Sequence, residues 1–188
     1  MSFFENPSLV DHKTKELLIY VASKLHSRPT YGATVLNKVL YFIDCESYLR
    51  TGKPVTNFTY VKLASGPAPK PTQFLCLMNA LVRSGDITEG VTERFGKTQT
   101  RHIPMRQPVL SQFDSDELVL INKVINSFCT KSAADISNMT HQLIAWKFAR
   151  INEELPFFTC LLTSKPISED DIRWAEDSIS KFELMSNN

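Results

Sequence analysis

Thr140 and His141 are the neighbouring residues whose types come nearest to a catalytic hydroxyl and its base. Nucleophilic catalysis needs a hydroxyl or thiol whose proton passes to a histidine that a carboxylate orients. Neighbouring residues on a helix point about 100° apart, so their side chains rarely hydrogen-bond to each other. The pattern therefore favours a histidine that bonds a backbone group within the fold. A small hydrolase built on His141 is the weaker alternative.

Metal and phosphate sites lack their usual spacings in this chain. The histidines stand apart, with no H-x-x-x-H pair, whereas a metal site needs clustered ligands. Gly66 precedes Pro67, which has no N–H to offer an anion, and no glycine-rich phosphate loop is found. The acid pair Glu153-Glu154 has the character of a solvated helix end rather than of a hydrolytic dyad. We predict a protein that is not an enzyme and carries no cofactor or metal.

Composition and charge narrow the class of protein further. The 188 residues include 21 Lys and Arg against 20 Asp and Glu, a net charge of +1. Proteins that bind nucleic acid concentrate positive charge, so the near-neutral chain argues against a nucleic-acid partner. Four widely separated cysteines indicate neither a disulfide framework nor a zinc site. Because no signal peptide and no apolar run near the ~20 residues of a membrane span are found, we expect a cytoplasmic protein without a membrane partner.

The element that must position the polar residues is a helix predicted over Thr34–Arg50. At ~100° per residue, four apolar residues fall on one arc: Leu36, Val39, Leu40 and Ile43. Three more widen this arc to roughly half the circumference: Val35, Phe42 and Leu49. So broad an apolar face needs other elements wrapped around it. We therefore predict a central buried helix.

A second, polar-tipped stripe runs along the same helix. It consists of Asn37, Tyr41, Asp44 and Tyr48, with Lys38 beside it. The stripe is either a satisfied polar seam in the core or one wall of a partner-binding surface, because tyrosine serves well in both places. The sequence leaves both interpretations open.

The remaining elements follow from hydrophobic periodicity and turn residues. Helices are predicted over Asp11–His26, Pro71–Ser84 and Asp114–Cys129, from Ser132 towards Trp146, and from Ser168 onwards. One short strand is predicted over Asn57–Ala64, followed by a rigid proline loop over Ser65–Pro69. Phe157–Leu162 is either a strand or a buried extended piece. The fold class is therefore mainly α (α+β): a single compact helical domain over residues 1–188, with one short strand and a polar β-hairpin.

The predicted hairpin, Asp86–Met105, is the most basic segment of the chain. Arg94 and Lys97 flank its tip, and Arg101, His102 and Arg106 add to its charge. The order helix, strand, helix, hairpin loosely follows a winged-helix domain, whose basic wing can touch DNA phosphates. The alternative function is therefore a DNA-binding transcriptional regulator, with Arg94, Lys97 and Arg101 as candidate phosphate contacts.

Several segments together resemble one family, the SocA-like antitoxins, also called the Panacea domain. L-N-K-V-L-Y-F at Leu36–Phe42 is similar to the family's L-x-K-L-L-Y-F pattern, and T-G-K-P at Thr51–Pro54 resembles the turn after it. Y-V-K-L-A-S-G-P-A-P at Tyr60–Pro69 resembles the strand that leads into G-P-V-P. I-S-N-M-T-H-Q-L-I-A-W at Ile136–Trp146 is similar to L-S-x-x-S-H-x-x-x-x-W. The resemblance runs in order over about Lys15–Glu183.

The resemblance implies a non-catalytic antitoxin of bacteria and phages, which neutralises a protein toxin encoded by an adjacent gene through direct binding. It also implies a second expected partner, a AAA+ protease, because one member of the family delivers its toxin to such a protease as an adaptor. Because the domain pairs with unrelated toxins, the family does not identify the toxin. The motif positions become candidate partner-binding residues: Asn37, Lys38, Tyr41, Asp44, Tyr48, Ser65, Gly66, Pro67, His141 and Trp146.

Overall fold

The computed structural model describes residues 11–94, 96–162, 169–170, 172–174 and 179. Its first elements are α1 (His12–Leu25), α2 (Ala33–Thr51), β1 (Tyr60–Leu63), β2 (Gly66–Pro69), α3 (Pro71–Arg83), β3 (Ile87–Arg94) and β4 (Lys97–Pro104). The 3₁₀ turn η2 (Leu110–Gln112) then leads to α4 (Ser115–Phe128), α5 (Ala133–His141), α6 (Ile144–Phe148) and the 3₁₀ helix η3 (Phe157–Leu161). The predicted class, mainly α with a small β component, is confirmed. The last predicted helix, from Ser168, lies mostly outside the described residues.

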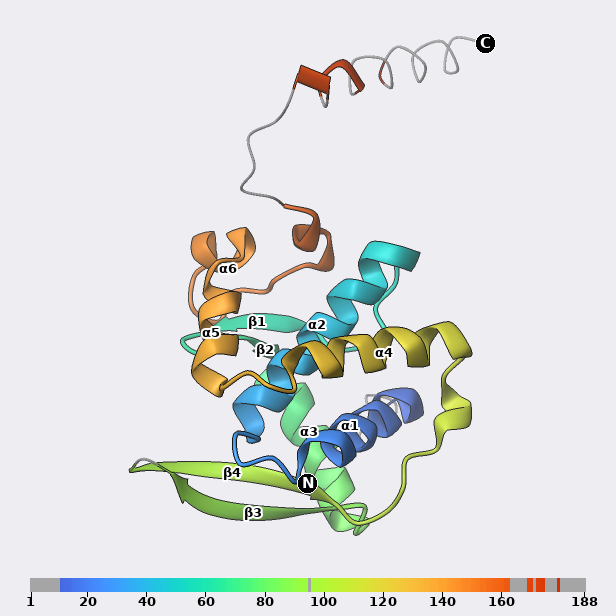
Figure 1. The fold of residues 1–188 in the computed structure, drawn as a ribbon, viewed down its shortest axis with the longest axis vertical. Helices are drawn as coiled ribbons and strands as arrows, with labels where there is room; N and C mark the ends of the chain where they lie inside the picture. The colour runs from blue at the N-terminus through green and yellow to red at the C-terminus, as the bar shows by residue number, and fades with distance from the viewer. Residues whose placement is uncertain (1–10, 95, 163–168, 171, 175–178, 180–188) are drawn as a thin grey trace, which may run out of the picture.

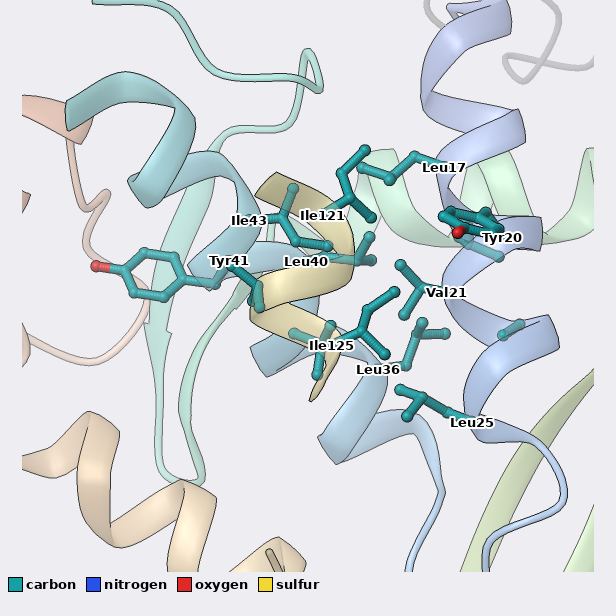
Figure 2. Close-up of a cluster of buried hydrophobic side chains, with 14 of the residues drawn as sticks. Leu17, Tyr20, Val21, Leu25, Leu36, Leu40, Tyr41, Ile43, Ile121 and Ile125 are labelled. Atoms are coloured by element: carbon teal, nitrogen blue, oxygen red, sulfur yellow. The ribbon is translucent and has the colours of Figure 1, made fainter. Parts of the chain in front are cut away.

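The helix predicted to be central, α2, runs through the middle of the fold (Figure 1). Most of its apolar arc is buried, but Phe42 is half-buried and Leu49, near the end of the helix, is 47% exposed. Figure 2 shows the arc between the side chains of two neighbouring helices: Leu17, Val21 and Leu25 of α1, and Ile121 and Ile125 of α4. Tyr41 points away from this cluster, to the other side of α2 (Figure 2). The helix therefore has an apolar face, which packs against α1 and α4, and a polar-tipped face on its other side.

Capping residues define the ends of these helices. Asp11 accepts two backbone N–H groups of the first turn of α1, and Gly52 ends α2 with a positive φ of 73°. Asp114 and Glu117 form a reciprocal capping box at the start of α4. Side chains of this kind satisfy the backbone donors that a helix start leaves unpaired.

The proline loop predicted over Ser65–Pro69 is instead a second strand. β2 pairs antiparallel with β1, with Tyr60 opposite Pro69 and Lys62 opposite Pro67. The two prolines are two residues apart, so the same edge of the strand carries both missing N–H groups. That edge is the one away from β1, where no ladder bond is needed. Prolines at alternate positions are therefore compatible with β2 as an edge strand.

The predicted basic hairpin is confirmed as β3 and β4, which pair from Ile87 opposite Pro104 to Arg94 opposite Lys97. It packs against the helical body through α3 and α1 (Figure 1). In contrast, the strand or buried extended piece predicted over Phe157–Leu162 is wrong. Pro156 has a φ of −60° and starts the 3₁₀ helix η3 there, and Phe158 lies exposed.

Arg106, just after β4, ties the hairpin to α1 through two carboxylates. Its Nη2 donates to Oε1 of Glu16 at 2.6 Å, and its Nε donates to Oδ1 of Asp86 at 2.6 Å. Glu16 is only 1% exposed and also accepts the Val109 N–H. The hydrogen bond from Arg106 holds the pKa of the Glu16 carboxyl below its ordinary value.

Changing Arg106 to Met should lower the free energy of unfolding by about 2 kcal/mol, because Glu16 would stay buried without its charged partner. The Arg106 side chain is 33% exposed, which reduces the cost below that of a fully buried pair. The depressed pKa of Glu16 means that its stabilising contribution is present at neutral pH and lost as the pH falls through that pKa. When urea unfolding is measured at several pH values, the free energy of unfolding of R106M should therefore fall less steeply towards acid pH than that of the wild type. R50M, which breaks the exposed Arg50–Glu46 pair, is the control and should change little.

Candidate functional site

Lys38, beside the polar stripe of α2, is buried against β2. It is 1% exposed, and its Nζ donates to the carbonyl of Pro67 at 2.7 Å. Because N–H and C=O of one strand residue point the same way, this carbonyl lies on the edge of β2 that faces away from β1. Burial lowers the pKa of Lys38 to about 8. Lys38 therefore serves as the donor for an edge carbonyl that the two-stranded ladder leaves free.

Gly66 is the point where α2, β2 and α5 come closest. Its φ is +111°, and a Cβ there would lie 2.3 Å from Oγ1 of Thr140 and 2.6 Å from Cε of Lys38. Thr140 is fully buried and donates its hydroxyl to the carbonyl of Ser137. Ser65, the preceding candidate, is exposed in the turn between the strands. Gly66 in the Gly66-Pro67 motif therefore lets the backbone of β2 approach the side chains of Lys38 on α2 and Thr140 on α5 closely.

Asp44 holds the segment between α2 and β1. It is 0% exposed, and its Oδ1 accepts the backbone N–H groups of Val55 at 2.9 Å and Thr56 at 2.8 Å. Its Oδ2 accepts the hydroxyls of Thr56 at 2.5 Å and Tyr60 at 2.6 Å. Burial raises the pKa of Asp44 to about 6, although the four hydrogen bonds act in the opposite direction. One carboxylate thus fixes the path of the chain from Val55 to Tyr60.

The two tyrosines of the stripe contact η3. The Tyr41 hydroxyl lies 3.9 Å from Sγ of Cys160, and the Tyr41 ring meets Tyr60 edge-on at 5.1 Å. Tyr48 stacks on Phe157 with ring centroids 5.8 Å apart. Asn37 is half-buried, and its Oδ1 has no hydrogen-bond partner among the described residues. Tyr41, Asp44 and Tyr48 of the stripe are therefore each held by a hydrogen bond or a ring contact with another segment of the chain.

His141 and Trp146 stack on each other, with ring centroids 3.9 Å apart and planes 16° apart. The Trp146 Nε1 donates to the carbonyl of Leu63, and Lys62 lies over the indole ring at 4.3 Å. Nε2 of His141 has no hydrogen-bond partner in the described part of the chain. The expected backbone bond to His141 is therefore not seen at this nitrogen, and the contact shown for the ring is its stacking on the indole. The Thr140 hydroxyl is used within its own helix, so the two do not form a nucleophile–base pair.

The basic residues of the hairpin divide into two groups. Arg101 donates through Nη2 to the carbonyls of Arg28, at 2.9 Å, and His26, beyond the end of α1. His102 is buried, and this burial lowers its pKa. Arg94 and Lys97 pair through their backbones at the end of the hairpin, and their side chains lie outside the described set. Of the three candidate phosphate contacts, Arg101 thus uses its guanidinium in hydrogen bonds within the fold.

Sequence reasoning missed the partners that Asp44 finds in Thr56 and Tyr60. These residues lie 12 and 16 positions away, and no spacing in the sequence connects them to a buried carboxylate.

Among the described residues, no group of three or more His, Cys, Asp and Glu is placed to hold a metal ion. None of the helices described there has both the length and the apolar character for crossing a bilayer.

The fold and the site together define a class of protein, a mainly helical domain whose polar motif residues hold its own strands and loops around one central helix. The sequence model described as antitoxin SocA-like, Panacea domain, matches residues 36–147. The chain belongs to this family. The match begins at the first residue of L-N-K-V-L-Y-F and ends just after Trp146, so it covers β1, β2 and the hairpin as well. No curated protein and no solved structure gives a significant match.

Proposed function

We propose that this protein neutralises a protein toxin by binding it directly. The observation that carries the proposal is the membership of an antitoxin family over residues 36–147. The buried positions of Lys38, Tyr41 and Asp44 favour a scaffold role for the polar stripe, so the toxin would bind elsewhere on the surface. Delivery of the bound toxin to a AAA+ protease is an additional role that this function would allow.

The surface that we propose for the toxin is the exposed apolar end, defined as Phe148, Ile151, Phe158 and Leu161. Their exposed fractions run from 58% to 85%, and they come from α6, η3 and the loop between them, at one end of the molecule (Figure 1). The elements α6 and η3 contact each other, and exposed apolar side chains on neighbouring elements can form a protein-binding surface. They begin directly after the family match ends, which suits a domain that meets different toxins with different residues.

The double variant Phe148→Ser with Ile151→Ser should weaken toxin binding at least about tenfold, because truncating an apolar anchor at the centre of an interface costs about 2 kcal/mol or more. Its melting temperature should stay close to that of the wild type, since neither side chain is part of the core. Val119→Ser is the matched control, because Val119 is 65% exposed on α4, an element that is not part of the exposed apolar end. If V119S weakens binding as much as the double variant does, the exposed apolar end is not the contact face.

Co-expression in bacteria tests the proposed function itself. The product of the adjacent gene should arrest growth when expressed alone, and co-expression of this protein should restore growth. The variant F148S/I151S should restore growth less well than V119S. If the adjacent gene's product is harmless alone and does not co-purify with this protein, the antitoxin proposal fails.

A DNA-binding regulator is the second candidate, because the end of the hairpin, with Arg94 and Lys97, extends past the neighbouring elements (Figure 1). This candidate is weakened because the side chains of Arg101 and Arg106 form hydrogen bonds within the protein, which leaves fewer basic groups of this segment for phosphates. A gel-shift assay with the protein's own upstream DNA separates the two functions. Phosphate binding would weaken steeply with salt and would be lost in the variant R94E/K97E, whereas an antitoxin would neutralise its toxin with or without these changes.

A further inference from the structure

The loop between α6 and η3 is fixed on strand β1. Both backbone groups of Lys62 bind this loop: its N–H donates to the carbonyl of Glu153 at 2.9 Å, and its carbonyl accepts the N–H of Asn152 at 2.8 Å. The start of the loop is held as well, because Nζ of Lys62 donates to the carbonyl of Ala149 at 2.8 Å. The backbone of the loop therefore has little freedom to lose when a partner binds.

The middle of the loop is a tight turn beside the exposed apolar end. The N–H of Glu153 donates to the carbonyl of Arg150 at 3.0 Å, and Oε2 of Glu153 accepts the N–H of Arg150 at 2.6 Å. Asn152 has a positive φ of 66°, which asparagine adopts more readily than most residues. An open hollow of about 610 Å³ is lined by Phe148, Arg150, Ile151, Asn152 and Glu153. Because Phe148 and Ile151 are both exposed apolar side chains, the hollow is a place where an apolar side chain of a partner can leave water.

The charged side chains at this end divide into those with partners and those without. Glu153 uses its carboxylate in the turn, and Glu154 pairs with Lys70 at 3.2 Å. Lys147, on α6, and Arg150, which lines the hollow, are exposed. Within the described part of the chain, neither of these two side chains forms an ion pair or a hydrogen bond. A partner that covers them removes their hydration, which is costly unless the partner supplies carboxylates.

Building on the proposed function, we propose that the exposed apolar end binds a segment of the toxin that carries apolar and acidic side chains on one surface. An apolar side chain of this segment enters the hollow lined by Phe148 and Ile151, and its carboxylates pair with Lys147 and Arg150. An acidic segment fits better than a neutral or a basic one, because carboxylates replace the water that the two cations lose.

Charge reversal at this end tests the inference. Lys147→Glu with Arg150→Glu should weaken binding of the purified product of the adjacent gene at least about tenfold in a calorimeter, because like charges would then face each other. Lys147→Gln with Arg150→Gln removes both charges without reversing them and should give a smaller loss. The affinity of the wild type should fall as the salt concentration is raised from about 50 mM to about 500 mM, because ions screen exposed charges. K147Q/R150Q should respond less to salt than the wild type.

The matched control is Arg83→Glu with Lys123→Glu, which changes the net charge of the protein by the same amount. Both residues are exposed, on α3 and α4, and neither belongs to the exposed apolar end. R83E/K123E should bind the toxin nearly as tightly as the wild type does. Circular dichroism and the melting temperature of each variant establish that the compared proteins are folded.

The inference is overturned if the wild type binds the toxin and K147E/R150E binds it as tightly as R83E/K123E does, and in that case the proposed function stands. If the wild type binds no toxin, the proposed function itself fails and the inference fails with it. Two other occupants of this end would also overturn the inference. A second copy of the chain would give a dimer on size-exclusion chromatography that K147E/R150E disrupts. An anionic membrane would give co-sedimentation with phosphatidylglycerol vesicles that K147E/R150E abolishes.

Discussion

Replacing Asp44 with alanine should lower the free energy of unfolding by about 4 kcal/mol, which is a large effect for one substitution. The carboxylate accepts two backbone N–H groups and two hydroxyls at a position that is 0% exposed. Alanine would leave all four donors in a site from which water is excluded. Loss of the carboxylate's own burial cost offsets only part of this, and we expect a large drop in the urea midpoint.

Asp44→Asn is the matched control for this prediction. Its Oδ1 can still accept from the N–H groups of Val55 and Thr56, and it removes the buried charge. D44N should therefore cost less than half as much as D44A. Near-equal stability of D44A and the wild type would show that the segment from Val55 to Tyr60 does not depend on this carboxylate. In that case the scaffold role of the polar stripe would be lost as well.

Gly66→Ala should cost about 3 kcal/mol, the sum of a backbone effect and a packing effect. The φ of +111° is unfavourable for any residue with a Cβ, and the new atom would approach Oγ1 of Thr140 to 2.3 Å. Lys38 cannot move aside freely, because its Nζ is bonded to the Pro67 carbonyl. Thermal unfolding followed by circular dichroism measures the loss.

Gly85→Ala separates the two effects. Gly85 has a φ of +75°, but a Cβ there would meet nothing within 4 Å, so its cost is the backbone effect alone, about 1 kcal/mol. The difference between G66A and G85A measures the packing of α2, β2 and α5 at Gly66 together with the additional backbone strain of its larger φ. If the two variants lose the same stability, the close approach at Gly66 contributes nothing.

The parts of the fold that depend on local sequence were predictable. The apolar arc of α2, the N-cap at Asp11, the capping box at Asp114 and the end of α2 at Gly52 each follow from residues within a few positions of one another. Hydrophobic periodicity and capping are physical effects of that range. The hairpin was predictable for the same reason, because its two arms are joined by a short tip.

The parts that depend on distant contacts were not. β2 looks like a loop because its prolines cannot donate hydrogen bonds, and only its place at the edge of a sheet makes them harmless. The role of the polar stripe stayed open because its partners are far away in the chain: Pro67 for Lys38, Tyr60 for Asp44 and Cys160 for Tyr41. The basic residue Arg101 looked free for phosphates until its contacts with the carbonyls after α1 were visible.

Burial of Lys38, Tyr41 and Asp44 changes where the toxin surface is expected. A motif that is shared across a family can preserve a fold, and here Leu36–Phe42 and Gly66–Pro67 meet inside the molecule. A partner-binding surface must instead present side chains to solvent. The exposed apolar end meets that requirement with Phe148 and Ile151, which follow directly after the family match.

We propose that this protein acts by binding a toxin through a surface separate from its polar stripe, and one binding measurement tests this claim. The protein and the purified product of the adjacent gene are titrated in a calorimeter, with the wild type, V119S and F148S/I151S compared under the same conditions. We predict a saturable complex for the wild type and V119S, and a dissociation constant at least about tenfold weaker for F148S/I151S. A titration in which the wild type gives no heat and no complex on size-exclusion chromatography would contradict the claim.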